Sequence, residues 1–145
     1  SGASGTTDNA ATSKLTIDGS NVVVNTNLSL SSPMITTGST PSYTLGLAPG
    51  PGASVSIVGN AVAGLISLTT DATTTASEDI ITVTFPTALA GAPKAVILTA
   101  GNQTAAATAN RYFISTLSTT GFTIKNTNNS LSASLIYKIY YYVIQ

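Results

Sequence analysis

The sequence contains no cysteine, no histidine and no tryptophan, and charged residues make up only 7% of its 145 residues. An ordinary soluble domain carries about 25% charged residues. Without cysteine the chain has no disulfide, thiolate zinc site or iron–sulfur cluster. Without histidine it has no Ser-His-Asp or Cys-His catalytic arrangement and no imidazole metal ligand. We therefore expect a protein that is not an enzyme and that uses no cofactor.

The few charges balance each other, because five Lys and Arg residues face five Asp and Glu residues. A net charge of zero removes the counterion release that drives nucleic-acid binding and the polybasic attraction to membrane surfaces. The mean hydropathy is +0.33, yet polar residues, glycine and proline interrupt every apolar run before the ~18 residues that a membrane span needs. We expect neither a nucleic-acid partner nor membrane insertion.

What the chain has in abundance is serine and threonine, which account for 43 of the 145 residues. Apolar and polar residues alternate with a period of two at 55–57, 82–85 and 122–124, and turn residues such as Gly59-Asn60 separate the alternating runs. No segment has a helical stripe of 12 residues, and the best helical candidate, Gln103 to Ala109, is short enough to be a loop. The sequence predicts an all-β protein.

The aromatic residues divide the chain into two parts. Residues 1–58 contain only Tyr43, whereas residues 59–145 contain the other eight. The second part has enough apolar bulk for an antiparallel, jelly-roll-like β-sandwich. Its strands are expected near 62–69, 79–85, 95–100, 111–117, 121–125 and 135–145. The expected inward-facing residues are Ile66, Leu68, Ile81, Val83, Phe85, Val96, Leu98, Phe113, Phe122 and Ile124.

Residues 1–58 have short candidate strands with small side chains. These lie near 15–17, 22–25, 28–30, 43–47 and 55–58. A compact domain with so little apolar bulk is marginal on its own, while the low charge and recurring aliphatic residues argue against disorder. We expect a thin, intertwined β stalk whose core is shared between subunits, with Val22, Val24, Leu28 and Leu30 at the contact. This places the domain boundary between residues 58 and 59.

The last predicted strand is apolar on both faces. Its odd positions are Tyr137, Ile139, Tyr141 and Val143, and its even positions are Ile136, Tyr140, Tyr142 and Ile144. A half-exposed strand would have one polar face. One face should therefore meet the core, and the other a second surface: a covering loop, a ligand, or another subunit. We take the subunit as the main interpretation, which adds Tyr140 and Tyr142 to the expected interface.

The order of segments from Gly59 onward is similar to that of a known class of proteins. The segments are Gly59-Asn60, Ala63-Gly64, Ser67 to Thr70, Ile81-Thr82-Val83-Thr84-Phe85, Ala92 to Thr99, Asn102, Ser118 to Ile124, Leu131 to Ser134 and the Tyr-rich end. The chain resembles the C-terminal, receptor-binding domain of tailed-bacteriophage tail fibres and related virion fibre proteins. Residues 15–25 resemble the repetitive shaft that precedes such domains.

The resemblance implies a parallel homotrimer on the virion, with a β stalk and a sandwich tip that contacts a bacterial cell-surface glycan or another outer-surface receptor. Binding residues cannot be carried over, because the tips of this family differ in where they bind. Two alternatives stay open. One is a purely structural head or collar fibre or decoration protein without a ligand, and the other is a polysaccharide depolymerase with carboxylates from different subunits.

The best candidate ligand surface is the segment from Gly101 to Arg111. Its ligand groups would be Asn102, Gln103, Asn110, Arg111 and Tyr112. Planar amides, a guanidinium and an aromatic face are groups that bind sugars. The alternative is that Arg111 forms a salt bridge and Tyr112 lies in the core. A second polar tip, Lys125 to Ser130, fits a simple turn better.

The acidic residues offer little for catalysis or metal binding. Glycoside hydrolysis needs two carboxylates about 5–9.5 Å apart, and Glu78 and Asp79 are adjacent, so on a strand they point to opposite faces. Asp71 could face either of them, although an acidic hairpin rim explains all three residues. Asp18-Gly19 fits a hairpin turn better than a calcium site, which needs 6–8 oxygens. We expect no metal.

Overall fold

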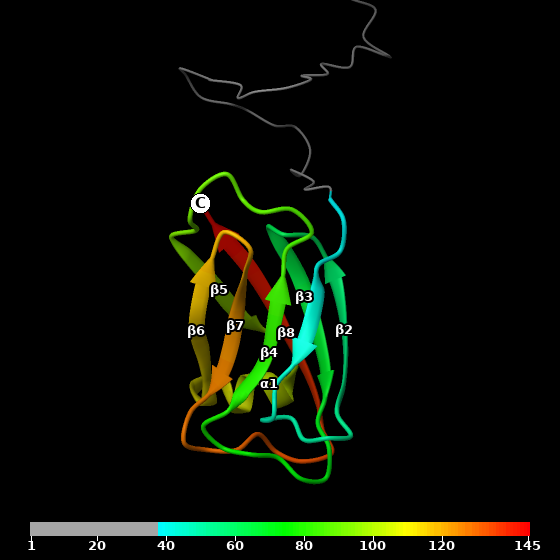
Figure 1. Ribbon diagram of the computed structural model, residues 1–145. Coiled ribbons are helices and arrows are strands. Elements are labelled where there is room, and N and C mark those ends of the chain that lie inside the picture. Colours follow the sequence, from blue (N-terminus) through cyan, green and yellow to red (C-terminus); the bar gives the residue numbers. More distant parts are fainter. Residues whose placement is uncertain (1–37) are drawn as a thin grey trace, which may run out of the picture. The chain divides into compact units, whose positions relative to one another are not determined.

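The structure is a computed structural model that describes residues 38–145 of the chain. Within this part, eight strands form two four-stranded antiparallel sheets that face each other, in the orders β1-β4-β7-β6 and β2-β3-β8-β5 (Figure 1). The strands are β1 (Ser42–Leu45), β2 (Ser54–Gly59), β3 (Ala63–Thr69), β4 (Asp79–Thr84), β5 (Ala95–Ala100), β6 (Tyr112–Ser118), β7 (Gly121–Asn126) and β8 (Ile136–Ile144). The helix α1 (Gln103–Ala107) and the 3-10 helix η1 (Ala109–Arg111) lie between β5 and β6. The predicted all-β sandwich is confirmed.

The strands predicted from residue 59 onward agree with the observed ones to within one residue at each end. Their connectivity is different from the expected one. In a jelly roll the first and last strands are neighbours in one sheet, whereas here β1 pairs with β4, and β8 pairs with β3 and β5 in the other sheet. The jelly-roll-like expectation is therefore wrong. Instead, the β2–β3 and β6–β7 hairpins place consecutive strands side by side.

The expected domain boundary between residues 58 and 59 is also wrong, because it falls inside β2. Both β1 and β2 pair with strands of the sandwich, and the compact unit that contains them begins before β1. The Tyr43 hydroxyl donates a hydrogen bond of 3.0 Å to the carbonyl oxygen of Val55, which links the edge strand of one sheet to the edge strand of the other. Residues 1–37 of the expected stalk, including Val22, Val24, Leu28 and Leu30, lie outside the described residues.

The core forms where the inward side chains of the two sheets meet. Seven of the ten expected inward residues are buried: Ile66, Leu68, Ile81, Val83, Phe85, Phe122 and Ile124. Val96 and Leu98 are partly buried and pack against this core. The tenth residue, Phe113, points outward and is 46% exposed.

The outward position of Phe113 follows from a β-bulge. The register between β6 and β7 shifts between Ile114 and Thr116, so one extra residue is inserted in β6. Because side chains alternate with a period of two, one inserted residue exchanges the faces of every residue before it. Tyr112, which a regular strand would place outside with Phe113 inside, is buried instead.

Tyr141 joins the two sheets at the centre of the core. Its ring lies 5.3 Å from the ring of Phe122, which in turn lies 6.0 Å from that of Phe85. Its hydroxyl donates a 2.6 Å hydrogen bond to the backbone oxygen of Asn60, in the turn between β2 and β3. Burial raises the pKa of Tyr141 from 10.0 to about 12, because the ionised phenolate would lose its hydration.

Replacing Tyr141 with phenylalanine tests this contact. At neutral pH, Tyr141→Phe should lower the free energy of unfolding by about 1 kcal/mol through the lost hydrogen bond. Below pH 10 the phenol is protonated in both the folded and the unfolded state. Between pH 10 and about 12 the unfolded state ionises first, so the wild-type protein should lose up to about 1.4 kcal/mol per pH unit from this group. Urea unfolding should show a shallower alkaline loss in Tyr141→Phe.

The control is Tyr142→Phe, because the Tyr142 side chain is exposed. Removing its hydroxyl group should leave both the free energy of unfolding and its alkaline slope close to those of the wild type. Equal alkaline slopes for the wild type and Tyr141→Phe would contradict the role of Tyr141.

Candidate functional site

The segment from Gly101 to Arg111, expected to be a ligand loop, is folded into α1 and η1. Asn102 is the N-cap of α1, and the short helix closes the end of the sandwich away from the C-terminus (Figure 1). The interpretation of residues 103–109 as a loop is wrong. A five-residue helix lacks the stripe that marks longer helices in a sequence, and here a capping amide, not periodicity, starts it.

Every polar group of the Asn102 amide is engaged inside the protein. Its Oδ1 accepts hydrogen bonds from the backbone nitrogens of Ala105 (3.0 Å) and Lys138 (3.2 Å), and its Nδ2 donates to the carbonyl oxygen of Ile136 (2.8 Å). The side chain therefore holds α1 against β8. Because the amide oxygen and one of the two amide N–H groups both serve the fold, Asn102 has a structural role.

The other four candidate residues do not form one surface either. Tyr112 is buried, and its hydroxyl donates to the carbonyl oxygen of Ala105 (3.3 Å). Burial, and to a smaller extent the neighbouring Tyr137, raises the pKa of Tyr112 above its ordinary value. Arg111 donates from Nη1 to the carbonyl oxygen of Ser130 (3.2 Å). Only Gln103 and Asn110 are exposed, so the ligand site that the sequence predicted is not assembled.

Asn102→Ala distinguishes the structural role from ligand binding. We expect the free energy of unfolding to fall by about 2 kcal/mol, because the helix cap and the link to β8 are lost together. The neighbouring Gln103→Ala is exposed and should change stability by less than about 0.5 kcal/mol. Denaturant unfolding measures both values. Loss of cell binding by Asn102→Ala at a temperature where it is fully folded would show instead that Asn102 contacts a ligand.

The acidic residues and the second polar tip serve the loops at the α1 end of the sandwich. Asp71 accepts hydrogen bonds from the backbone nitrogens of Gly52 (3.0 Å) and Ala72 (2.7 Å). Asn126, expected at an exposed tip, is buried; its Oδ1 accepts from the Glu78 nitrogen (2.7 Å) and its Nδ2 donates to the Thr75 oxygen (2.6 Å). Nothing in the sequence distinguishes this amide from an exposed one. Among residues 38–145, no group of three or more acidic side chains could hold a metal ion.

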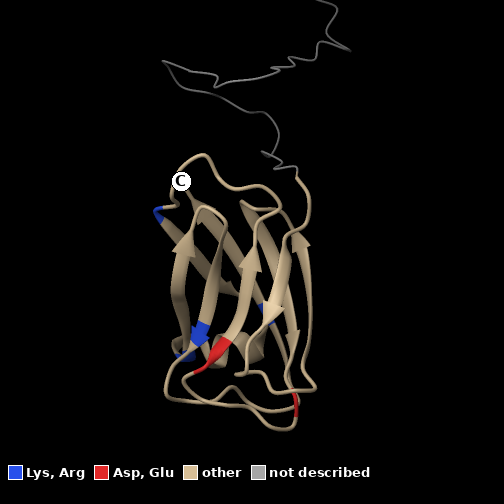
Figure 2. Ribbon diagram, in the orientation of Figure 1, with Lys and Arg blue, Asp and Glu red and all other residues tan. Residues whose placement is uncertain are grey.

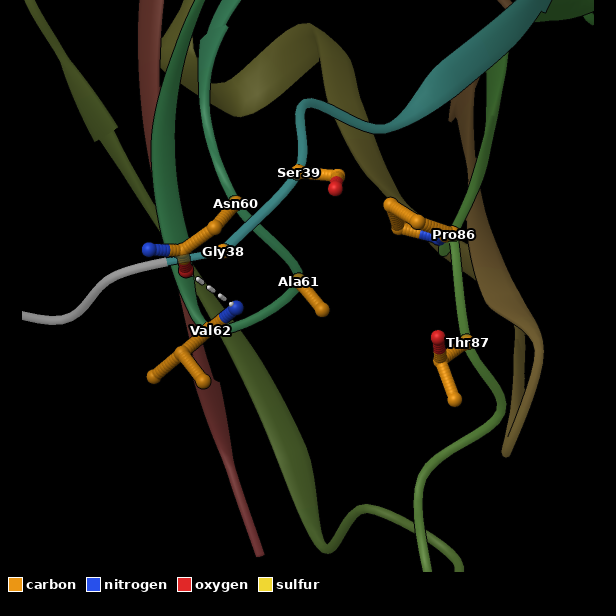
Figure 3. Close-up of a pocket in the computed structure, with 7 residues that line it drawn as sticks. All are labelled: Gly38, Ser39, Asn60, Ala61, Val62, Pro86 and Thr87. Atoms are coloured by element: carbon orange, nitrogen blue, oxygen red, sulfur yellow. Dashed lines mark hydrogen bonds between the residues drawn. The ribbon is translucent and has the colours of Figure 1, made fainter.

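A small pocket lies at the opposite end, beside the β2–β3 turn. Its volume is about 150 Å³ and its lining is Gly38, Ser39, Asn60, Ala61, Val62, Pro86 and Thr87. Figure 3 shows Pro86 and Thr87 on one wall, across from Ala61, and the hydrogen bond of 2.8 Å in which the Val62 nitrogen donates to Asn60 Oδ1. The lining includes the hydroxyl groups of Ser39 and Thr87 but no titratable side chain, so it holds no general acid or base that could activate them.

The outer side of the β2-β3-β8-β5 sheet is the most unusual surface of the described part. Val58, Leu65, Ile97, Tyr140 and Tyr142 lie next to one another on it, and we call these five residues the apolar face. The strand register pairs Val58 with Leu65, Leu65 with Tyr140, and Tyr142 with Ile97. Val58 is 70% exposed, and Ile97, Tyr140 and Tyr142 are about half exposed. Ile136 and Ile144 extend this surface along β8.

The two tyrosines of the apolar face are held differently from the buried ones. Tyr140 lies against Gly101, where an added Cβ would come within 2.8 Å of the Tyr140 ring. Neither the Tyr140 nor the Tyr142 hydroxyl forms a hydrogen bond with any residue between 38 and 145. Lys138 is the only charged residue that β8 presents on this side. The predicted two-faced character of the last strand is confirmed: its odd residues are in the core and its even residues form an outer apolar surface.

Charged residues are sparse throughout the sandwich. Figure 2 shows most of them toward the end where α1 lies, away from the centre of either sheet.

Within the described residues, no helix has the length and apolar content to cross a membrane. No protein family, curated protein or solved structure matches the chain.

Proposed function

We propose that this chain is the C-terminal part of a homotrimeric bacteriophage virion fibre, and that its sandwich attaches the virion to the host surface without catalysis. The observation that carries the proposal is the apolar face. Contiguous exposed apolar patches mark protein–protein contacts, and the centres of such contacts are rich in tyrosine and poor in charge. In the proposed fibre, the apolar face packs against neighbouring copies of the chain.

The size of the apolar face is suited to the centre of such an interface. From the 150–250 Å² that one aromatic side chain can bury, the half-exposed Tyr140 and Tyr142 offer about 75–125 Å² each. A stable interface needs about 800 Å² from each partner, and Val58, Ile97 and Ile136 add to the tyrosines. A chain with a net charge of zero also has little electrostatic repulsion between copies.

Attachment in this proposal depends on multivalency. Three weakly binding sandwiches on one fibre act as linked sites, and linkage can strengthen attachment by roughly 10²–10⁴ over a single site. The rival function is a head or collar fibre, or a decoration protein, that binds no receptor. One observation favours this rival. The side chains of Asn102, Arg111 and Tyr112 donate hydrogen bonds to backbone oxygens of the same chain, and the donors used in these bonds do not bind a ligand.

Lysine substitutions on the apolar face test the assembly. The wild-type chain should have a mass near three times 14.5 kDa by light scattering. In the double variant Ile97→Lys/Tyr142→Lys, two charges replace paired apolar residues, so the mass should fall to that of one chain and cell attachment should weaken by at least about 100-fold. The matched control, Ser42→Lys/Thr44→Lys, puts two charges on exposed residues of the other sheet and should remain trimeric.

Circular dichroism would establish that both double variants are folded. A wild-type mass of 14.5 kDa would contradict the trimer, and an Ile97→Lys/Tyr142→Lys protein that stays trimeric would remove the apolar face from the interface. A wild-type trimer that attaches to no cell type would favour the structural fibre.

A further inference from the structure

The outer side of the β1-β4-β7-β6 sheet has the opposite character to the apolar face. Seven hydroxyl side chains and one glycine form two rows across its four strands. The first row is Thr44, Thr82, Thr123 and Thr116, and the second is Ser42, Thr84, Gly121 and Ser118. We call these eight residues the hydroxyl face. It contains no charged side chain, and no element of residues 38–145 covers it (Figure 1).

A hollow lies beside Gly121 in the second row. This hollow of about 90 Å³ is lined by Thr82, Val83, Thr84, Thr116, Ser118, Thr120, Gly121, Phe122 and Thr123. A Cβ at Gly121 would overlap the carbonyl oxygen of Val83, so the close pairing of β4 and β7 requires glycine here. Six of the nine residues that line the hollow carry a hydroxyl group, and we call these six groups the rim hydroxyls.

The rim hydroxyls fall into two classes. Thr82 and Thr123 share a hydrogen bond of 3.0 Å, and Ser118 Oγ donates to the Gly121 oxygen (3.3 Å). Thr120 Oγ1 also shares a hydrogen bond of 3.1 Å with Ser118 Oγ, so these bonds fix four rim side chains in place. The hydroxyls of Thr84 and Thr116 form no hydrogen bond within residues 38–145, and both side chains are exposed. The hollow thus has a fixed frame and two hydroxyls available as both donors and acceptors.

We infer that this hollow is a binding subsite for one residue of a neutral glycan, an inference that rests on the proposed attachment function and gives it a location. Hydroxyl groups match the donors and acceptors of an uncharged sugar, and the threonine methyl groups meet its C–H surface. An acidic sugar would need Arg or Lys to pair with its carboxylate, and none lines the hollow. The hollow holds roughly three waters, which the sugar edge displaces.

The position of the hollow agrees with the proposed assembly. The hydroxyl face and the apolar face are the outer sides of the two opposed sheets. When the apolar face packs against other copies, the hydroxyl face of each copy remains open to solvent. The single subsite is shallow and uncharged, so it binds weakly by itself, and attachment requires several copies acting together.

The test uses the full chain, an array of neutral and sialylated oligosaccharides, and whole cells of candidate hosts. We expect the wild type to bind one or more neutral glycans. Thr84→Val and Thr116→Val each remove a hydroxyl that has no internal partner, so both variants should fold normally and lose roughly five- to tenfold in binding. Thr44→Val is the matched control on the same face, outside the hollow, and should bind like the wild type.

The outcomes separate this inference from the function on which it rests. Binding to sialylated glycans alone, or neutral-glycan binding that Thr84→Val and Thr116→Val leave unchanged, would overturn the subsite while attachment stands. Cell attachment without binding to any neutral glycan would also overturn it. If the wild type binds neither cells nor glycans, the proposed attachment function fails, and the subsite fails with it.

Discussion

The arrangement of the sandwich depends on β8, a nine-residue strand that is hydrogen-bonded on both sides. Its inward side chains, Tyr137, Ile139, Tyr141 and Val143, are all buried and fix the register of both neighbouring strands. Because side chains alternate, a slip of one residue would bring Tyr140 and Tyr142 into the core and expose four buried residues. The bond from the Tyr141 hydroxyl to the β2–β3 turn opposes such a slip, so the outer apolar residues have a fixed place on the surface.

This constraint explains why the two ends and the two faces of the molecule differ. Loops at the α1 end are held by buried or engaged amides, with Asn102 bound to β8 and Asn126 bound to the loop before β4. Such amides satisfy backbone groups that would otherwise be buried without partners. The faces, in contrast, carry side chains with few internal bonds. The surfaces suited to partners are therefore the outer sides of the sheets and not the folded segment 101–111.

The sequence predicted the strands well because alternation with a period of two is a local signal, and it predicted both faces of β8 for the same reason. The predictions from the sequence were wrong where the position of a residue is decided by contacts with distant parts of the chain. The bulge in β6 exchanged the faces of Tyr112 and Phe113, and no residue type marks it. The domain boundary was misplaced because apolar bulk was used as the criterion, although β1 and β2 are edge strands that need only Leu45, Val55 and Ile57 to join the core. The roles of Asn102 and Asn126 were missed because a buried amide looks like an exposed one in a sequence.

The two sheets provide an internal comparison that bears on the apolar face. Central strands of the first sheet also have buried inner sides, and their outer positions are hydroxyl residues, such as Thr82 and Thr84 in β4 and Thr123 in β7. A central strand of this chain thus needs no apolar residue on its outer side, and threonine suits a strand as well as tyrosine does. Neither β-propensity nor the core requires Tyr140 and Tyr142 to be aromatic. In the proposed assembly, a contact with neighbouring copies of the chain accounts for their character. The apolar neighbours Ile97 and Val58 suit a protein surface there, since a sugar would need polar groups in their place.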